Sequence, residues 1–148
     1  MRAYARAHIR LGRIEQAIEL FEKLYTALPK DPDILNALAY AYDMQGDKRA
    51  LEYAARAYKL APEQASVLDT YGWLLTRNGQ PAKALKHLRK ARLLAPAAAE
   101  VRYHLGVTLH QLDRDDEAVS ELRGALHKST GFEGAAQAAA LLNKLAPG

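Results

Sequence analysis

The chain contains no cysteine, which excludes disulfides, thiolate metal sites and a thiol nucleophile. It has no apolar run of 18 residues, so no segment is predicted to span a membrane. No charged start is followed by an apolar stretch, and we expect no signal peptide in this chain. No stretch alternates with period two, so we predict no β-strand. The lack of cysteine does not distinguish a cytoplasmic protein from a periplasmic one.

Sequence signatures of catalysis are also absent. There is no glycine-rich phosphate loop and no serine nucleophile motif. No two histidines stand three or four residues apart on one predicted helix, as a local metal pair requires. Asp115, Asp116 and Glu117 begin a predicted helix and suit its dipole better than a metal. We expect the carboxylates on solvent faces and predict no enzymatic activity, no cofactor and no metal site.

Acidic residues are missing between Thr70 and Ala99, where several cations gather. These cations are Arg77, Lys83, Lys86, Arg89, Lys90 and Arg92. The net charge of +4 is modest, so we favour a solvated helix face beside the acidic segment that follows. A partner-docking patch and a nucleic-acid surface are the alternatives, and the modest charge argues against nucleic acid.

What the chain does have is a repeat of about 34 residues, with one residue missing between Gly46 and Ala50. Turn residues recur at Gly12, Gly46, Gly79 and Asp113. Small residues follow the turns at Ala17, Ala50, Ala84 and Ala118. Helix breaks recur at Pro29, Pro62, Pro96 and Thr130. A fixed period of this size is typical of stacked units rather than one globular core.

Each unit is predicted to form two helices, because apolar residues recur at helical spacing on both sides of its turn. We expect first helices over 1–11, 33–45, 66–78 and 99–111. We expect second helices over 14–27, 48–60, 81–94 and 115–127. A ninth helix over 133–145, rich in alanine and leucine, is expected to cover the last unit.

Glycine or alanine also recurs at one first-helix position, in Ala5, Ala39, Gly72 and Gly106. With the period, the alanines and the closing prolines, this pattern resembles the tetratricopeptide repeat family over essentially the whole chain. The resemblance implies an all-α, right-handed α-solenoid of four helix hairpins plus a C-terminal capping helix. In the family's frame, one domain over 1–148 comprises repeats 1–31 (truncated at its start), 32–64, 65–98 and 99–132, then the capping helix 133–145.

The resemblance implies that certain first-helix positions face a concave groove. From these we take as candidate binding residues Arg2, Arg6, Arg10, Asn36, Tyr40, Asp43, Met44, Asp69, Trp73, Arg77, Tyr103, Val107 and His110. Other residues at these positions are Ile9, Asp33, Ser66, Thr76, Glu100 and Gln111. Aromatic residues and arginine are the types that anchor protein interfaces.

We hypothesise that an extended or helical peptide lies across Tyr40, Trp73 and Tyr103, with an acidic group near the arginines. The alternative is that Tyr40 and Trp73 only pack between adjacent first helices. The leading prediction is a non-enzymatic scaffold that binds a peptide or partner protein. The second is a segment of a longer superhelix that self-associates through its ends, since the first helix has no capping residue.

A narrower resemblance concerns two segments, Val67–Trp73 and Val101–Leu105. They look like C-terminal repeats of large bacterial proteins of the exosortase, or PEP-CTERM, system. That resemblance implies a bacterial source and a context related to the cell envelope.

Overall fold

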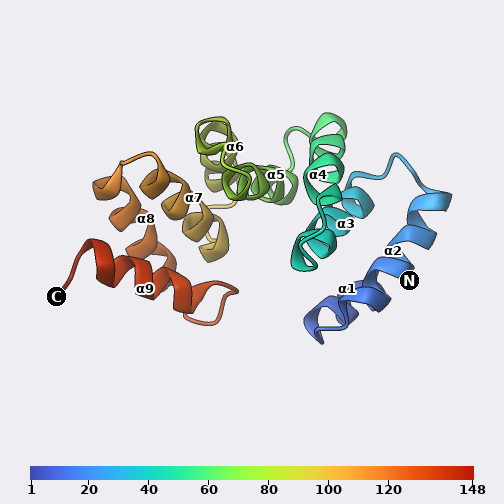
Figure 1. The fold of residues 1–148 in the computed structure, drawn as a ribbon, viewed down its shortest axis with the longest axis horizontal. Coiled ribbons are helices and arrows are strands. Elements are labelled where there is room, and N and C mark those ends of the chain that lie inside the picture. Colours follow the sequence, from blue (N-terminus) through green and yellow to red (C-terminus); the bar gives the residue numbers. More distant parts are fainter.

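The computed structural model describes all residues from Met1 to Gly148, as nine helices and no strand. The helices are α1 (Arg2–Arg10), α2 (Ile14–Ala27), α3 (Pro32–Met44), α4 (Arg49–Leu60), α5 (Ala65–Arg77), α6 (Pro81–Leu94), α7 (Ala99–Gln111), α8 (Asp115–Lys128) and α9 (Ala135–Leu145). They follow one another along an arch, with α1 and α9 near its two ends (Figure 1). The predicted all-α array is confirmed. None of the helices combines the length and the apolar character that crossing a membrane requires.

The turn within each hairpin repeats one backbone geometry. Gly12, Gly46 and Gly79 have φ of 71°, 71° and 75°, a left-handed conformation that costs glycine little. Asp113, in the fourth hairpin, adopts φ of 59° without being glycine. Aspartate is among the few other residues that tolerate this region, so the fourth turn closes like the first three.

The two helices of a hairpin approach closely where the first helix carries a small residue. A Cβ on Gly72 would lie 2.6 Å from Cγ of Leu88, and one on Gly106 would lie 2.9 Å from the Leu122 side chain. Leu88 and Leu122 are fully buried at these crossings. The small residues therefore make room for the leucines that fill the interior of each hairpin.

Successive hairpins share their apolar interiors, so the core runs along the arch. One cluster joins α1 to α5 around Phe21, Leu38 and Tyr42. Another joins α5 to α8 around Leu88. A third places α9 over the last hairpin, where Ala138 is fully buried. The expected cover on the last unit is thus present, and α3, α5 and α7 contact one another in sequence along the stack.

Candidate functional site

Two hollows open along the first helices. The N-terminal hollow, of about 930 Å³, is lined among others by Arg2, Arg6, Arg10, Asp33, Asn36, Tyr40 and Thr70. The C-terminal pocket, of about 390 Å³, is lined among others by Tyr40, Asp43, Met44, Asp69, Thr70, Trp73, Arg77, Glu100, Tyr103, His104, Glu133 and Gln137. Neither hollow is lined by a residue of α2, α4, α6 or α8. Because both include Tyr40 and Thr70, the two hollows adjoin.

The N-terminal hollow is basic. Arg2 pairs with Asp31 and lies 4.0 Å from the carboxylate of Asp33. Arg6 and Arg10 are exposed and make no ion pair. The side-chain oxygen of Asn36 is buried there without a hydrogen-bond partner. The two free guanidinium groups leave this hollow with positive charge that no residue of the chain neutralises.

An aromatic wall forms one side of the C-terminal pocket. The ring of Trp73 stacks on the imidazole of His104, with centroids 4.2 Å apart and an interplanar angle of 17°. The ring of Tyr103 lies 5.6 Å from that of Trp73. Trp73 on α5 therefore packs against α7 and also lines the pocket. The peptide-binding hypothesis and the packing alternative are compatible at this residue.

The pocket is bridged by a contact between distant parts of the chain. The hydroxyl of Tyr40, on α3, donates to the carboxylate of Glu133, in the segment that precedes α9. Beside it, Gly134 has φ of 96°, and a Cβ there would lie 2.5 Å from the Tyr103 ring. This close approach, which only glycine permits, brings the start of α9 against the aromatic wall.

His104 forms a buried ion pair behind the wall. Its Nδ1 lies 2.8 Å from the carboxylate of Asp69, and its Nε2 lies 3.9 Å from that of Glu100. Burial alone lowers the pKa of His104. The charge of Asp69 and the hydrogen bond to it, with smaller effects of Glu100 and Glu133, outweigh burial, and the pKa is raised. The imidazole is thereby favoured in its charged form.

Two other carboxylates of the pocket, those of Asp43 and Glu100, have raised pKa values. Asp43 pairs with Arg77, yet burial raises the pKa of Asp43 more than Arg77 lowers it. Burial also raises the pKa of Glu100, and the charges of Asp69 and Glu133 add to that rise although His104 opposes it. At both carboxylates burial therefore disfavours the charged form.

The structure brings together eleven of the thirteen predicted site residues in the two hollows. Val107 and His110 are not among them. Val107 packs against the apolar cluster under α9. The Nδ1 of His110, in the last turn of α7, lies 2.7 Å from the carboxylate of Asp115, the first residue of α8. Both side chains already have partners within the last hairpin and its cover.

Sequence reasoning missed six residues of the C-terminal pocket, namely Thr70, Leu74, His104, Glu133, Gly134 and Gln137. It also expected the carboxylates on solvent faces, which Asp69 and Glu100 contradict, since both line the pocket and are partly buried. The sequence did contain one indication that Glu133 is special. Glu133 is the only acid after Glu121, an isolated charge before an apolar helix.

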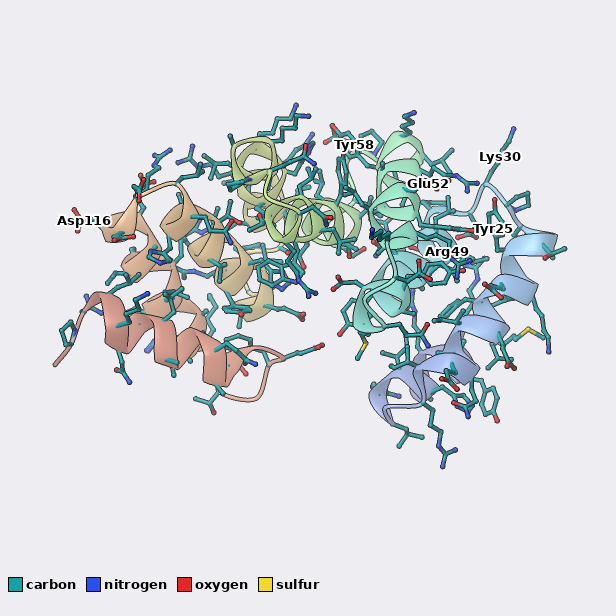
Figure 2. All side chains as sticks on the ribbon, in the orientation of Figure 1. Tyr25, Lys30, Arg49, Glu52, Tyr58 and Asp116 are labelled. Atoms are coloured by element: carbon teal, nitrogen blue, oxygen red, sulfur yellow. The ribbon has the colours of Figure 1, made fainter.

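The predicted basic cluster lies among acidic neighbours. Arg89 pairs with Glu117 at 3.2 Å and Arg92 with Glu121 at 2.8 Å. Lys90 pairs with Glu63. These pairs agree with the preferred interpretation of a solvated helix face. Figure 2 shows Glu52 on the outer helix α4 and Asp116 at the start of α8, whereas Tyr58 of α4 stacks on Tyr71 of α5.

Comparisons with known proteins give consistent matches. The family described as tetratricopeptide repeat matches residues 1–41 and again 72–139. The TPR repeat-containing protein PA4667 of Pseudomonas aeruginosa is 33% identical over 93 residues, which cover 60% of this chain and 16% of that protein. The protein CTR9 homolog of Arabidopsis thaliana is 28% identical over 124 residues, which cover 80% of this chain and 11% of that protein. The chain thus spans a small part of each relative.

Solved structures agree over nearly the whole chain. A structure of MamA AMB-1 has a TM-score of 0.75 and 28% identity, and the match covers 97% of this chain and 86% of that one. MamA 41-end from Desulfovibrio magneticus RS-1 has a TM-score of 0.76 at 21% identity, covering 97% of this chain and 80% of that one. The narrower resemblance to the exosortase system stays a prediction. The repeat period, the stacked hairpins and these matches show that the chain belongs to the tetratricopeptide repeat family, whose fold supports protein–protein interaction.

Proposed function

We propose that the concave side of this chain binds an extended or helical segment of a partner protein, as a scaffold without enzymatic activity. The observation that carries the proposal is the adjoining pair of hollows along the first helices, which share Tyr40 and Thr70. Together they offer a path from Arg6 past Tyr40 to Trp73. Arginine and aromatic side chains of this kind carry most of the binding energy in known interfaces.

Charge supports an orientation for the bound segment. Arg6 and Arg10 are exposed without acidic partners in the N-terminal hollow. An acidic group of the partner placed there gains charge-assisted hydrogen bonds, because a guanidinium pairs with a carboxylate through two parallel N–H donors. We therefore place an acidic residue of the partner in the N-terminal hollow and its apolar or aromatic residues near Trp73.

The test is a binding titration with peptides selected from a random displayed library against the full chain. Trp73→Ala and Tyr40→Ala are each expected to weaken binding by roughly 30-fold, the size of an interface hot spot of about 2 kcal/mol. Glu52→Ala serves as the control, because Glu52 is exposed on the outer helix α4. If both concave variants bind as the unmodified chain does, this site is ruled out.

A second candidate is self-association through α1. Met1, Tyr4 and Leu11 are 72%, 62% and 67% exposed at this end of the arch, and a second copy of the chain could cover them. Light scattering is expected to show oligomers that grow with concentration and disappear in a Tyr4→Glu and Leu11→Glu double variant. A single mass at every concentration would remove this candidate.

A further inference from the structure

The C-terminal pocket contains more acid than base. Its four carboxylates belong to Asp43, Asp69, Glu100 and Glu133, and its cations are Arg77 and His104. Two of the carboxylates have close cationic partners, Asp43 with Arg77 and Asp69 with His104. Glu100 has only the distant Nε2 of His104, at 3.9 Å, and Glu133 has only the hydroxyl of Tyr40. The pocket is therefore short of positive charge even when His104 is protonated.

The two under-neutralised carboxylates belong to different elements. Glu100 lies in the first turn of α7, and Glu133 precedes α9. Both line the same cavity as Trp73 and Tyr103. Trp73 is the only tryptophan of the chain, and its stacking on His104 covers one face of the ring while the side chain stays partly exposed. Carboxylates beside aromatic rings form a site for a flat or rounded organic cation.

We propose that this pocket takes a basic side chain of the partner segment, and that it prefers arginine to lysine. The inference rests on the proposed function and names the chemistry that one end of the groove recognises. A guanidinium is flat, stacks on aromatic rings and carries five N–H donors in a rigid fork. Glu100 and Glu133 line the same cavity as the aromatic wall, so a guanidinium bound there has both carboxylates and the rings as neighbours. An ammonium is a single point charge and cannot satisfy this arrangement equally well.

Other occupants fit less well. An acidic group would meet four carboxylates, and like charges brought together in an interface are unfavourable. A metal ion lacks a suitable set of ligands, since no group of three or more histidine, aspartate and glutamate side chains is arranged to hold one. A cavity of about 390 Å³ lies at the small end of ligand sites, which suits one side chain.

A bound guanidinium would also offset the unfavourable burial of charged carboxylates in the empty pocket. Burial raises the pKa of both Glu100 and Asp43, so their charged forms are disfavoured in the absence of a ligand. A bound cation offsets that penalty and stabilises both carboxylates in their charged form. With the free guanidiniums of Arg6 and Arg10 at the other end, the groove fixes a direction for the segment. Its arginine lies toward α9 and its acidic residue toward α1.

The test uses peptides selected from a random displayed library against the full chain and measured by the fluorescence of Trp73. We expect the selected peptides to share an arginine. Replacing that arginine with lysine should weaken binding several-fold, and replacing it with citrulline, its neutral isostere, should weaken binding at least tenfold. On the protein side, Glu100→Gln and Glu133→Gln should each weaken binding by roughly tenfold, as expected for one charged hydrogen bond.

Controls separate this inference from the proposed function. Glu52→Gln, on the outer side, should leave the affinity unchanged, and thermal melting should show that each glutamine variant folds as the unmodified chain does. Peptides that depend on Trp73 but bind equally well with citrulline would overturn the inference and leave the proposed function standing. A preference for lysine would overturn the choice of arginine. Peptides that depend on Tyr40 but not on Trp73 would also overturn the inference alone. If no selected peptide depends on either Trp73 or Tyr40, both proposals fail.

Discussion

The N-terminal hollow and the C-terminal pocket use the same positions of the repeat but differ in charge, in volume and in whether a further segment covers them. Arg6, Tyr40 and Trp73 are equivalent residues of consecutive units, and so are Arg2, Asn36 and Asp69. The basic end of the groove has a volume of about 930 Å³, and the acidic end has a volume of about 390 Å³. The comparison teaches that the hairpin backbone is constant while a few inner side chains set the chemistry of each segment.

The C-terminal pocket is partly closed by a segment that lies outside the four repeats. The segment that begins α9 reaches Tyr40 through Glu133 and packs on Tyr103 through Gly134. No such element lines the N-terminal hollow. The ninth helix therefore covers the apolar side of the last hairpin and also narrows the groove at its acidic end.

The largest loss of stability is expected in the core behind α5, the helix that contributes residues to both hollows. Leu88 is fully buried in the cluster that joins α5 to α8. Leu88→Ala should lower the free energy of unfolding by about 2–5 kcal/mol through lost burial and a residual cavity. Chemical denaturation followed by circular dichroism measures the change. Leu93→Ala is the matched control, because Leu93 is 75% exposed, and its effect should stay within about 0.5 kcal/mol. Equal effects of the two would refute the assigned packing.

A smaller loss of stability, confined to the C-terminal pocket and α9, is expected for a substitution at Gly134. Gly134→Ala forces a side chain into a left-handed backbone position and against the Tyr103 ring, at a cost of about 1–3 kcal/mol. Hydrogen exchange should accelerate in α9 and around the C-terminal pocket, while α1 and α3 keep their protection. Gly131→Ala is the control, since a Cβ there meets nothing within 4 Å. Unchanged protection of α9 would contradict the role given to Gly134.

The acidic region should also respond to pH. The folded-state pKa of His104 is raised above its ordinary value of about 6.5, so its stabilising contribution is complete below that pH. The contribution is lost as pH rises through the raised pKa. The raised pKa values of Glu100 and Asp43 act in the same direction at lower pH. NMR titration of the imidazole resonances, with unfolding measured in parallel, checks the sign. A His104 pKa below 6.5 in the folded chain would contradict it.

The smallest effect is expected for Tyr40→Phe, which removes one hydroxyl at the border of the two regions. The lost hydrogen bond to Glu133 is partly exposed to solvent, so stability should fall by about 1 kcal/mol or less. Local hydrogen exchange before α9 is the sensitive measurement. Tyr4→Phe, at an exposed tyrosine that makes no hydroxyl hydrogen bond, is the control. Identical exchange in both variants would show that the bridge contributes nothing.

The helices could be predicted from the sequence because local rules decide them. Every observed boundary lies within two residues of its expected position. Gly12, Gly46 and Gly79 mark turns that need a left-handed residue, and Asp113 fills the same place. The resemblance to the family implied that Tyr40 and Trp73 face the groove, and both line the C-terminal pocket.

The pocket chemistry could not be predicted in the same way. His104 and Asp69 are 35 residues apart, and Tyr40 and Glu133 are 93 residues apart. These contacts depend on the curvature of the whole stack and on where α9 returns, which no local pattern encodes. Val107 holds an inner position by the repeat frame, but it belongs to the last unit, where α9 provides its packing partners.

The most direct measurement is NMR mapping of a selected peptide on the isotope-labelled chain. The account predicts that shifted amides concentrate on α1, α3, α5 and α7, with the largest changes near Arg6, Tyr40, Trp73 and Tyr103. Shifts concentrated on the outer helices α2, α4, α6 and α8, with those four residues unchanged, would contradict it.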